Sequence, residues 1–221
     1  MPATPRRDAP SVPTGECGRC GACAECGTAL RNAAVCDACG ALNRSAAAPD
    51  PFALLGLAKA FDMDPAALNS TYRAIARRIH PDRFTNSDDP TRALAARLSA
   101  EINHAQQILA DPVQRANYLL VQAGGPTAAD LREVSDDLLV ETMTLREGIE
   151  DARSQRDVEA LASIRDDVTG RKNAALQRIA RSASKLPACD DAEKTELRKQ
   201  LNAMKYYDNL LAGTMDDSPR M

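Results

Sequence analysis

Apolar side chains recur between residues 65 and 110 at the spacing of two helices joined by a short loop. In the first segment they fall at i, i+4, i+7 and i+11, at Leu68, Tyr72, Ile75 and Ile79. A helix turns by about 100° per residue, so these positions share one side of it. The second segment has comparable spacing, at Leu94, Leu98, Ile102, Ala105 and Leu109. The pattern predicts an antiparallel helical hairpin.

The sequence His80-Pro81-Asp82 lies in the loop of this hairpin. Pro81 disfavours the helical region for His80 and itself has a fixed φ and no amide donor, so the first helix is predicted to end at His80. The loop is therefore a stiff corner that presents an imidazole and a carboxylate. Arginines follow the polar side of the first helix and flank the corner, at Arg73, Arg77, Arg78 and Arg83. An ordinary turn between two helices is the alternative interpretation.

Four Asp-Pro pairs predict where helices begin. Asp is a good N-cap acceptor, and Pro at the first helical position needs no amide donor. The pairs are Asp50-Pro51, Asp64-Pro65, Asp89-Pro90 and Asp111-Pro112. They predict a short helix that packs on the hairpin, the two hairpin helices, and a fourth helix that ends before Gly124-Gly125-Pro126.

Three further helices are predicted at residues 136–154, 157–185 and 190–211, enough for a small three-helix bundle. One stripe of the first helix faces the bundle, with Leu138, Leu145 and Ile149. A second side, about 100° to 200° around the helix, begins apolar and ends acidic, with Leu139, Val140, Met143, Glu147 and Asp151. The last helix leaves Tyr206 opposite its inward stripe of Leu197, Leu201, Met204 and Leu211. The second apolar side is either additional core, in contact with the hairpin domain, or a binding surface.

Composition excludes several classes of protein. At 221 residues the chain has room for one or two domains, and its formal net charge of -3 argues against a general nucleic-acid binder. No apolar run approaches the roughly 20 residues that span a bilayer, so we expect a soluble protein. Residues 1–14 lack the apolar core of a secretory signal. A cytoplasmic location is therefore expected, with an organelle matrix as the alternative.

Six of the seven cysteines lie between Cys17 and Cys39. Such local clustering indicates metal binding rather than disulfides in a reducing compartment. Cys-x-x-Cys turns suit a tetrahedral thiolate zinc site, because each turn presents two sulfurs to one ion. The predicted ligands of one structural zinc ion are Cys23, Cys26, Cys36 and Cys39, since a glycine follows both of these pairs.

Two alternatives for the cysteines stay open. The third pair, Cys17 and Cys20, is also followed by a glycine and could replace one of the other two. Six thiolates could also hold a binuclear or an iron–sulfur centre. If the cysteines bind a single structural zinc ion, the metal folds a segment that is too small to bury a core of its own.

The chain from Asp50 to Leu211 resembles the HscB branch of the J-domain proteins, the co-chaperones of iron–sulfur cluster assembly. The residues that carry the resemblance are Phe52-Ala53-Leu54-Leu55-Gly56-Leu57, His80-Pro81-Asp82-Arg83-Phe84, Ile102-Asn103 with Ala105 and Leu109, and Pro112 with Arg115-Ala116 and Tyr118-Leu119-Leu120. The cysteine-rich segment resembles an extension that precedes the J-domain in eukaryotic and some bacterial members. Pro51 and Gln106 depart from the pattern, because the family often has aromatic residues at these packing positions.

This resemblance implies an all-α fold. A flexible N-terminus at 1–16 is followed by a small zinc-ribbon-like segment at 17–42. The J-domain hairpin is expected at 50–122 and the C-terminal three-helix bundle at 127–213.

The resemblance also implies a function exerted on partners. Such a co-chaperone binds the iron–sulfur scaffold protein IscU, delivers it to a DnaK/HscA-class chaperone and stimulates the ATPase of that chaperone. The implied chaperone contacts are His80, Pro81, Asp82, Arg73, Arg77, Arg78 and Arg83. The implied scaffold contacts are Leu139, Val140, Met143, Glu147, Asp151 and Tyr206, whereas Thr144 stands where an acidic residue is common.

No residue pattern in the sequence indicates a catalytic site, so the chain is expected to activate an ATPase without being an enzyme. No nucleic-acid or membrane partner is expected. One rival hypothesis is a general J-domain co-chaperone for another client. Another is a zinc-ribbon protein that exchanges thiols and disulfides or binds nucleic acid, for which the cysteine segment offers few basic residues and no aromatic residue.

Overall fold

The structure of the chain is a computed structural model that describes residues 20–44 and 50–215. Within these ranges the regular structure is helical, apart from two isolated antiparallel bridges that join Ala22 to Ala29 and Val35 to Leu42. The all-α prediction is thereby confirmed. The predicted flexible segment 1–16 and Cys17 lie outside the described residues. Among the helices that are described, none has both the length and the hydropathy of a membrane span.

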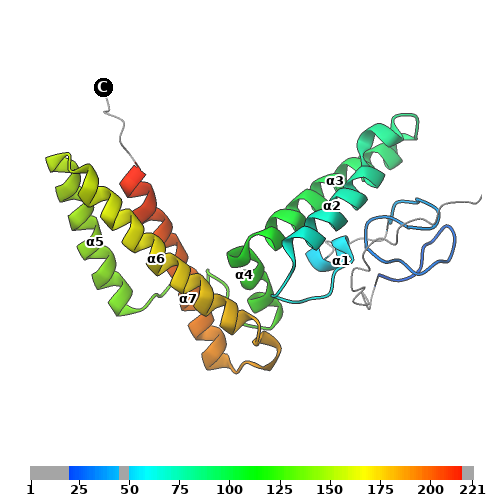
Figure 1. Cartoon of the computed structure of the whole chain (residues 1–221). Helices are drawn as coiled ribbons and strands as arrows, with labels where there is room; N and C mark the ends of the chain where they lie inside the picture. Colours follow the sequence, from blue (N-terminus) through cyan, green and yellow to red (C-terminus); the bar gives the residue numbers. More distant parts are fainter. Residues whose placement is uncertain (1–19, 45–49, 216–221) are drawn as a thin grey trace, which may run out of the picture. The chain divides into compact units, whose positions relative to one another are not determined.

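The described residues form two compact units, one that ends at Ala110 and one that begins at Asp111. The first unit contains the cysteine segment, α1 (Pro51–Leu55), α2 (Pro65–Ile79), the 3₁₀ turn η1 (Pro81–Phe84) and α3 (Asp89–Ala110). Helices α2 and α3 lie side by side as the predicted hairpin, and α1 packs on both (Figure 1). The core between them is apolar and fully buried, with Phe52, Leu55, Leu68, Ile79, Leu98, Ile102 and Leu109.

Three of the four predicted helix caps are confirmed. The carboxylates of Asp50, Asp64 and Asp111 accept hydrogen bonds from backbone amides in the first turns of α1, α2 and α4 (Pro112–Gln122). The fourth prediction is wrong, because Asp89 is itself the first residue of α3 and Asp88 bonds the side chain and backbone of Thr91 instead. Pro90 then occupies the second helical position, where the missing amide donor has no partner to lose.

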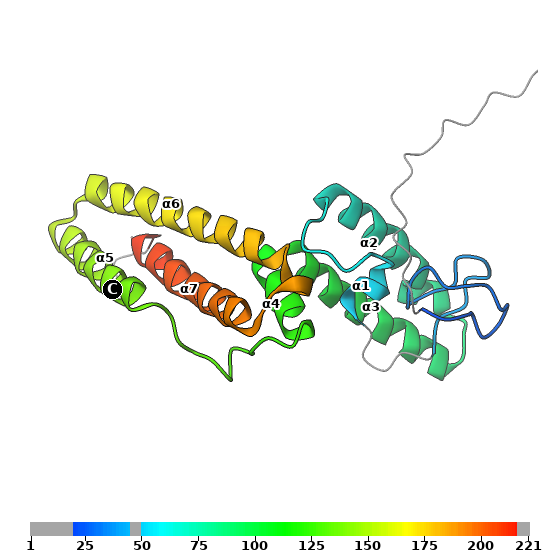
Figure 2. The same ribbon diagram turned by 90° about the horizontal axis from the view of Figure 1, so that it is seen from below.

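The second unit contains α4 (Pro112–Gln122), α5 (Asp136–Gln155), α6 (Val158–Ala183), the short turn η2 (Leu186–Ala188) and α7 (Asp191–Met215). Helices α5, α6 and α7 form the predicted three-helix bundle, with α6 and α7 alongside each other (Figure 2). Helix α4 packs against α6 and α7. The sequence predicts this helix in the same domain as the hairpin, whereas in the structure it packs in the second unit.

The bundle core follows the predicted stripes with two shifts. In α5, Leu138 and Ile149 are buried, but Leu145 is half-buried and Thr142 lies in the core. In α7 the buried stripe continues from Met204 through Tyr207 and Leu210, whereas Leu211 is half-buried. Helix α7 contacts α4, α5 and α6, so its buried arc is wider than one stripe and includes Tyr207 and Leu210.

Candidate functional sites

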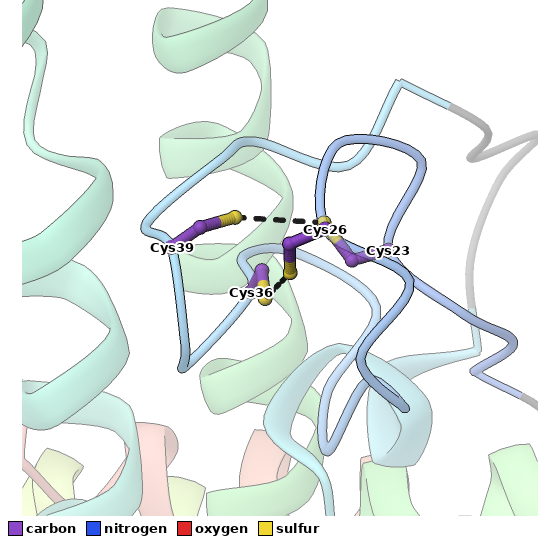
Figure 3. A group of neighbouring side chains, drawn as sticks. All are labelled: Cys23, Cys26, Cys36 and Cys39. Atoms are coloured by element: carbon purple, nitrogen blue, oxygen red, sulfur yellow. Dashed lines mark hydrogen bonds between the residues drawn. The ribbon is translucent and has the colours of Figure 1, made fainter.

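Two matching turns bring four cysteines together. In each turn the amide of a glycine donates to the carbonyl of the first cysteine, from Gly27 to Cys23 over 2.8 Å and from Gly40 to Cys36 over 3.0 Å. Figure 3 shows the four side chains converging from these two loops, those of Cys23, Cys26, Cys36 and Cys39. These are the four cysteines that the sequence predicts as zinc ligands.

The spacing of the sulfurs fits a single metal ion. The four Sγ atoms lie within 4.8 Å of one another. The Sγ atoms of Cys23 and Cys39 are 3.6 Å apart, and so are those of Cys26 and Cys36. Zn–S bonds of about 2.3 Å in a tetrahedron place neighbouring sulfurs about 3.8 Å apart. The cluster can therefore hold one metal ion with little movement.

The environment of the cluster shifts the pKa values of two of its thiols in opposite directions. Hydrogen bonds with Thr28 lower the pKa of the Cys26 thiol to about 6. In Cys39 a backbone hydrogen bond from Ala41 acts to lower the pKa, but hydrogen bonds with the neighbouring thiols, chiefly that of Cys26, and desolvation outweigh it and raise the pKa to about 12. Neighbouring thiols resist joint ionisation unless a cation is present. Metal binding here is therefore expected to release protons.

The cysteine segment is attached to the helices of the first unit. The amide of Ala33 donates to the carbonyl of Ala53 in α1 over 2.8 Å. From α2, Arg78 donates to the carbonyl of Cys36 over 2.6 Å and to that of Asp37 over 3.1 Å, and it also pairs with the Asp37 carboxylate. The second cysteine turn is thus joined to the helix that precedes the His-Pro-Asp corner.

The corner itself is on the surface. His80 ends α2, and its Nδ1 accepts a hydrogen bond from the Asp82 amide over 3.3 Å. The same Nδ1 lies 3.4 Å from a carboxylate oxygen of Asp82, whose side chain is 85% exposed. The imidazole therefore orders the first turn of η1 and leaves the carboxylate accessible to a partner.

The predicted basic residues are divided between two environments. Arg73, Arg77 and Arg83 are exposed, as a docking surface requires. Arg78 is half-buried, and its guanidinium donors already bond the cysteine segment. Asp37 lies 41 positions before Arg78 in the chain, so no local pattern could have indicated this contact.

The second apolar side of α5 is exposed. The exposed fractions are 40% for Leu139, 66% for Val140 and 64% for Met143. Glu147 and Asp151 continue this side and are exposed as well. These side chains are therefore not part of the core of the second unit. Of the two interpretations of the second apolar side, a binding surface fits this exposure.

Tyr206 meets this surface through a groove between α5 and α7. The groove has a volume of about 530 Å³ and is lined by residues 132–136, Leu139, Lys199 and Tyr206. Asn202 fixes one wall, because its side-chain amide donates to the carbonyls of Leu131 over 2.9 Å and Glu133 over 3.0 Å. The lining residues Arg132 and Lys199 were not predicted. Arg132 lies in the loop before α5, which has no periodic pattern, and Lys199 lies on α7, where it reaches the groove only through the packing of the helices.

Two family models match this chain, and the first extends past the boundary between the two units into α4. Residues 50–118 match the DnaJ domain, and residues 134–214 match the HSCB C-terminal oligomerisation domain. The co-chaperone protein HscB homolog of Colwellia psychrerythraea is 32% identical over 159 residues, which cover 68% of this chain and 91% of the relative. The Vibrio atlanticus homolog is 34% identical over 168 residues, which cover 73% and 98% of the two chains.

Solved structures agree with these matches. The chaperone HscB from Vibrio cholerae aligns with a TM-score of 0.64 at 29% identity, over 75% of this chain and 95% of that chain. The human co-chaperone protein HscB aligns with a TM-score of 0.71 over 87% of this chain and 96% of that chain, and at 23% identity it supports the fold alone.

Proposed function

Because the chain belongs to the HscB family of co-chaperones, we propose that it binds an IscU-type iron–sulfur scaffold protein and delivers it to a DnaK/HscA-class chaperone. The J-domain then stimulates ATP hydrolysis by the chaperone, and cluster assembly and transfer follow. The observation that carries this proposal is the pair of exposed surfaces, the His80–Asp82 corner on one unit and the α5 side on the other.

The corner is the proposed contact with the chaperone. Asp82 accepts from a basic group of the ATPase domain, and Arg73, Arg77 and Arg83 meet acidic groups. His80 and Pro81 fix the shape of the corner. A hydrogen bond that involves a charged group contributes about 1.5 to 3 kcal/mol. Loss of the Asp82 carboxylate therefore removes a large share of a transient interaction.

Replacement of Asp82 tests this contact. We expect Asp82→Ala to abolish stimulation of the chaperone ATPase while the helical circular dichroism signal is unchanged, because the side chain is exposed. Asp166→Ala, which removes an exposed carboxylate from α6, is the matched control and should stimulate like the wild type. Full stimulation by Asp82→Ala would exclude the docking role.

The exposed side of α5 is the proposed contact with the scaffold protein. Leu139, Val140 and Met143 supply apolar surface, and Tyr206 lies with Leu139 along the same groove. Glu147 and Asp151 extend the surface with negative charge. Apolar centres with a charged rim are typical of transient protein interfaces. The match to the HSCB C-terminal domain favours this client over that of a general J-domain co-chaperone.

The metal is proposed to be zinc, held by Cys23, Cys26, Cys36 and Cys39, with one ion per chain. Four thiolates and no open coordination position are typical of structural rather than catalytic zinc. Bound zinc would neutralise much of the thiolate charge and hold the two turns together. Metal analysis of purified protein should give about one zinc per chain, whereas a metal-free protein with four freely titrating cluster thiols would contradict the assignment.

A further inference from the structure

Arg78 joins the cysteine cluster to the end of α2. All three of its acceptors belong to the second cysteine turn, namely the Cys36 carbonyl at 2.6 Å, the Asp37 carbonyl at 3.1 Å and the Asp37 carboxylate. Cys36 is a proposed metal ligand, and its side chain is 1% exposed. The guanidinium therefore bonds the backbone that positions a ligand sulfur.

The last turn of α2, which carries Arg78, is itself held in place by burial and a hydrogen bond. Ile79, the next residue in α2, is fully buried, and its carbonyl accepts a hydrogen bond from the Ser99 hydroxyl over 3.3 Å. His80 follows and forms the corner. A movement of the cysteine turn that displaced Arg78 would thus act on the last turn of α2, directly before the docking residues.

The positive charge of Arg78 also favours its position beside the metal site. Four thiolates around one divalent cation leave a net negative centre. A planar guanidinium that donates from two nitrogens is well suited to hold such a centre in position. Residues outside the ligand shell that orient the ligands commonly change metal affinity by about 10- to 100-fold.

We propose that Arg78 is a positioning residue of the metal site and couples metal occupancy to the end of α2. The proposal rests on the proposed function in one respect, the binding of zinc by the cluster. Coupling of this kind is reciprocal. If the contacts of Arg78 strengthen zinc binding, bound zinc must stabilise those contacts by the same free energy, and Arg78 lies in the last turn of α2.

Zinc affinity of the full chain provides the first test, measured by competition with a chromophoric chelator. We expect Arg78→Gln to weaken zinc binding by about 10- to 100-fold. Arg77→Gln removes the same charge from the adjacent, exposed position and should match the wild type. If Arg78→Gln bound zinc as tightly as Arg77→Gln and the wild type, the coupling would be refuted but the zinc site would stand. A wild-type chain that binds no zinc would overturn both the coupling and the zinc site.

Amide hydrogen exchange provides a second test that needs no substitution. Removal of zinc from the wild-type chain should speed exchange at residues 76–80, whereas amides in the middle of α3 should keep their protection. In Arg78→Gln, zinc removal should no longer change exchange at the end of α2. Unchanged exchange at residues 76–80 of the wild-type chain after zinc removal would refute the coupling.

Discussion

Gly56 shows how one residue fixes the contact between α1 and the cysteine segment. It ends α1 in the left-handed conformation with φ +64°, and a Cβ built on it would lie 2.4 Å from the carbonyl oxygen of Arg31. That distance is far inside van der Waals contact, and the neighbouring atom belongs to the backbone. Glycine at position 56 is therefore required for close packing as well as for the turn.

Gly56→Ala is accordingly expected to destabilise the protein by more than the backbone conformation alone explains. Gly124→Ala is the matched control, because Gly124 has φ +76° and no atom lies within 4 Å of the place where a Cβ would be added. The control should cost about 1 to 2 kcal/mol from the left-handed conformation, and Gly56→Ala should cost clearly more. Urea denaturation monitored by circular dichroism measures both. Equal losses would contradict the close approach to Arg31.

Asp88 provides a pH-dependent contribution to stability. Hydrogen bonds with the side chain and then the backbone of Thr91 hold the pKa of this carboxyl below its usual value. A folded-state pKa that is lower than the unfolded one stabilises the protein above the unfolded pKa, and the effect is lost as the pH falls through the folded value. The relevant window therefore lies below about pH 4.

Asp88→Ala should lower the melting temperature at pH 7, and its difference from the wild type should shrink as the pH falls below about 4. Asp89→Ala removes only an exposed ion pair with Arg92 and should have little effect at either pH. Thermal unfolding at several pH values measures this. A larger effect of Asp89→Ala would restore Asp89 as the cap that the sequence predicts.

At the scale of elements, α7 joins α4 and the following loop through one buried arginine. Arg198 is 2% exposed, and it donates to the Pro126 carbonyl over 2.9 Å and to the Asn117 side-chain oxygen over 2.6 Å. This contact adds to the packing of α4 on α6 and α7, which places α4 in the second unit. The Gly124-Gly125-Pro126 break ends α4 and also supplies an acceptor to α7.

Arg198→Met should therefore destabilise the second unit by about 1.5 to 3 kcal/mol, the range for hydrogen bonds that involve a charged group. The adjacent Lys199→Met removes a half-exposed ion pair with Glu133 at 3.6 Å and should cost no more than about 1 kcal/mol. Chemical denaturation of both variants measures the difference. Similar losses would mean that Arg198 acts as an ordinary surface residue.

The helices were predictable from the sequence because their signals are local. Apolar periodicity gave the hairpin and the bundle, and Asp64-Pro65 marked the start of α2 to the residue. The packing of α4 was not predictable, since its partners α6 and α7 are distant in the chain; Asn117 and Arg198, for example, are 81 positions apart. The four clustered sulfurs were predictable, because the Cys-x-x-Cys spacing is a local signal. The contact between Arg78 and Cys36 was not, because these residues are 42 positions apart.

At the scale of the whole molecule, the proposed function needs one chain to carry two separate surfaces. The corner lies on the first unit and the exposed α5 side on the second. A protein that binds both partners raises their effective concentration toward each other. The chain alone should therefore stimulate the ATPase through the corner. Scaffold protein bound to the α5 side should increase this stimulation further.

The steady-state ATPase rate of the chaperone, with and without scaffold protein, tests this claim most directly. The wild-type chain should stimulate the rate alone and stimulate it further when scaffold protein is added. Leu139→Ala combined with Met143→Ala should keep the first effect and lose most of the second. Equal loss of both effects in this double variant would contradict the account of two separate surfaces.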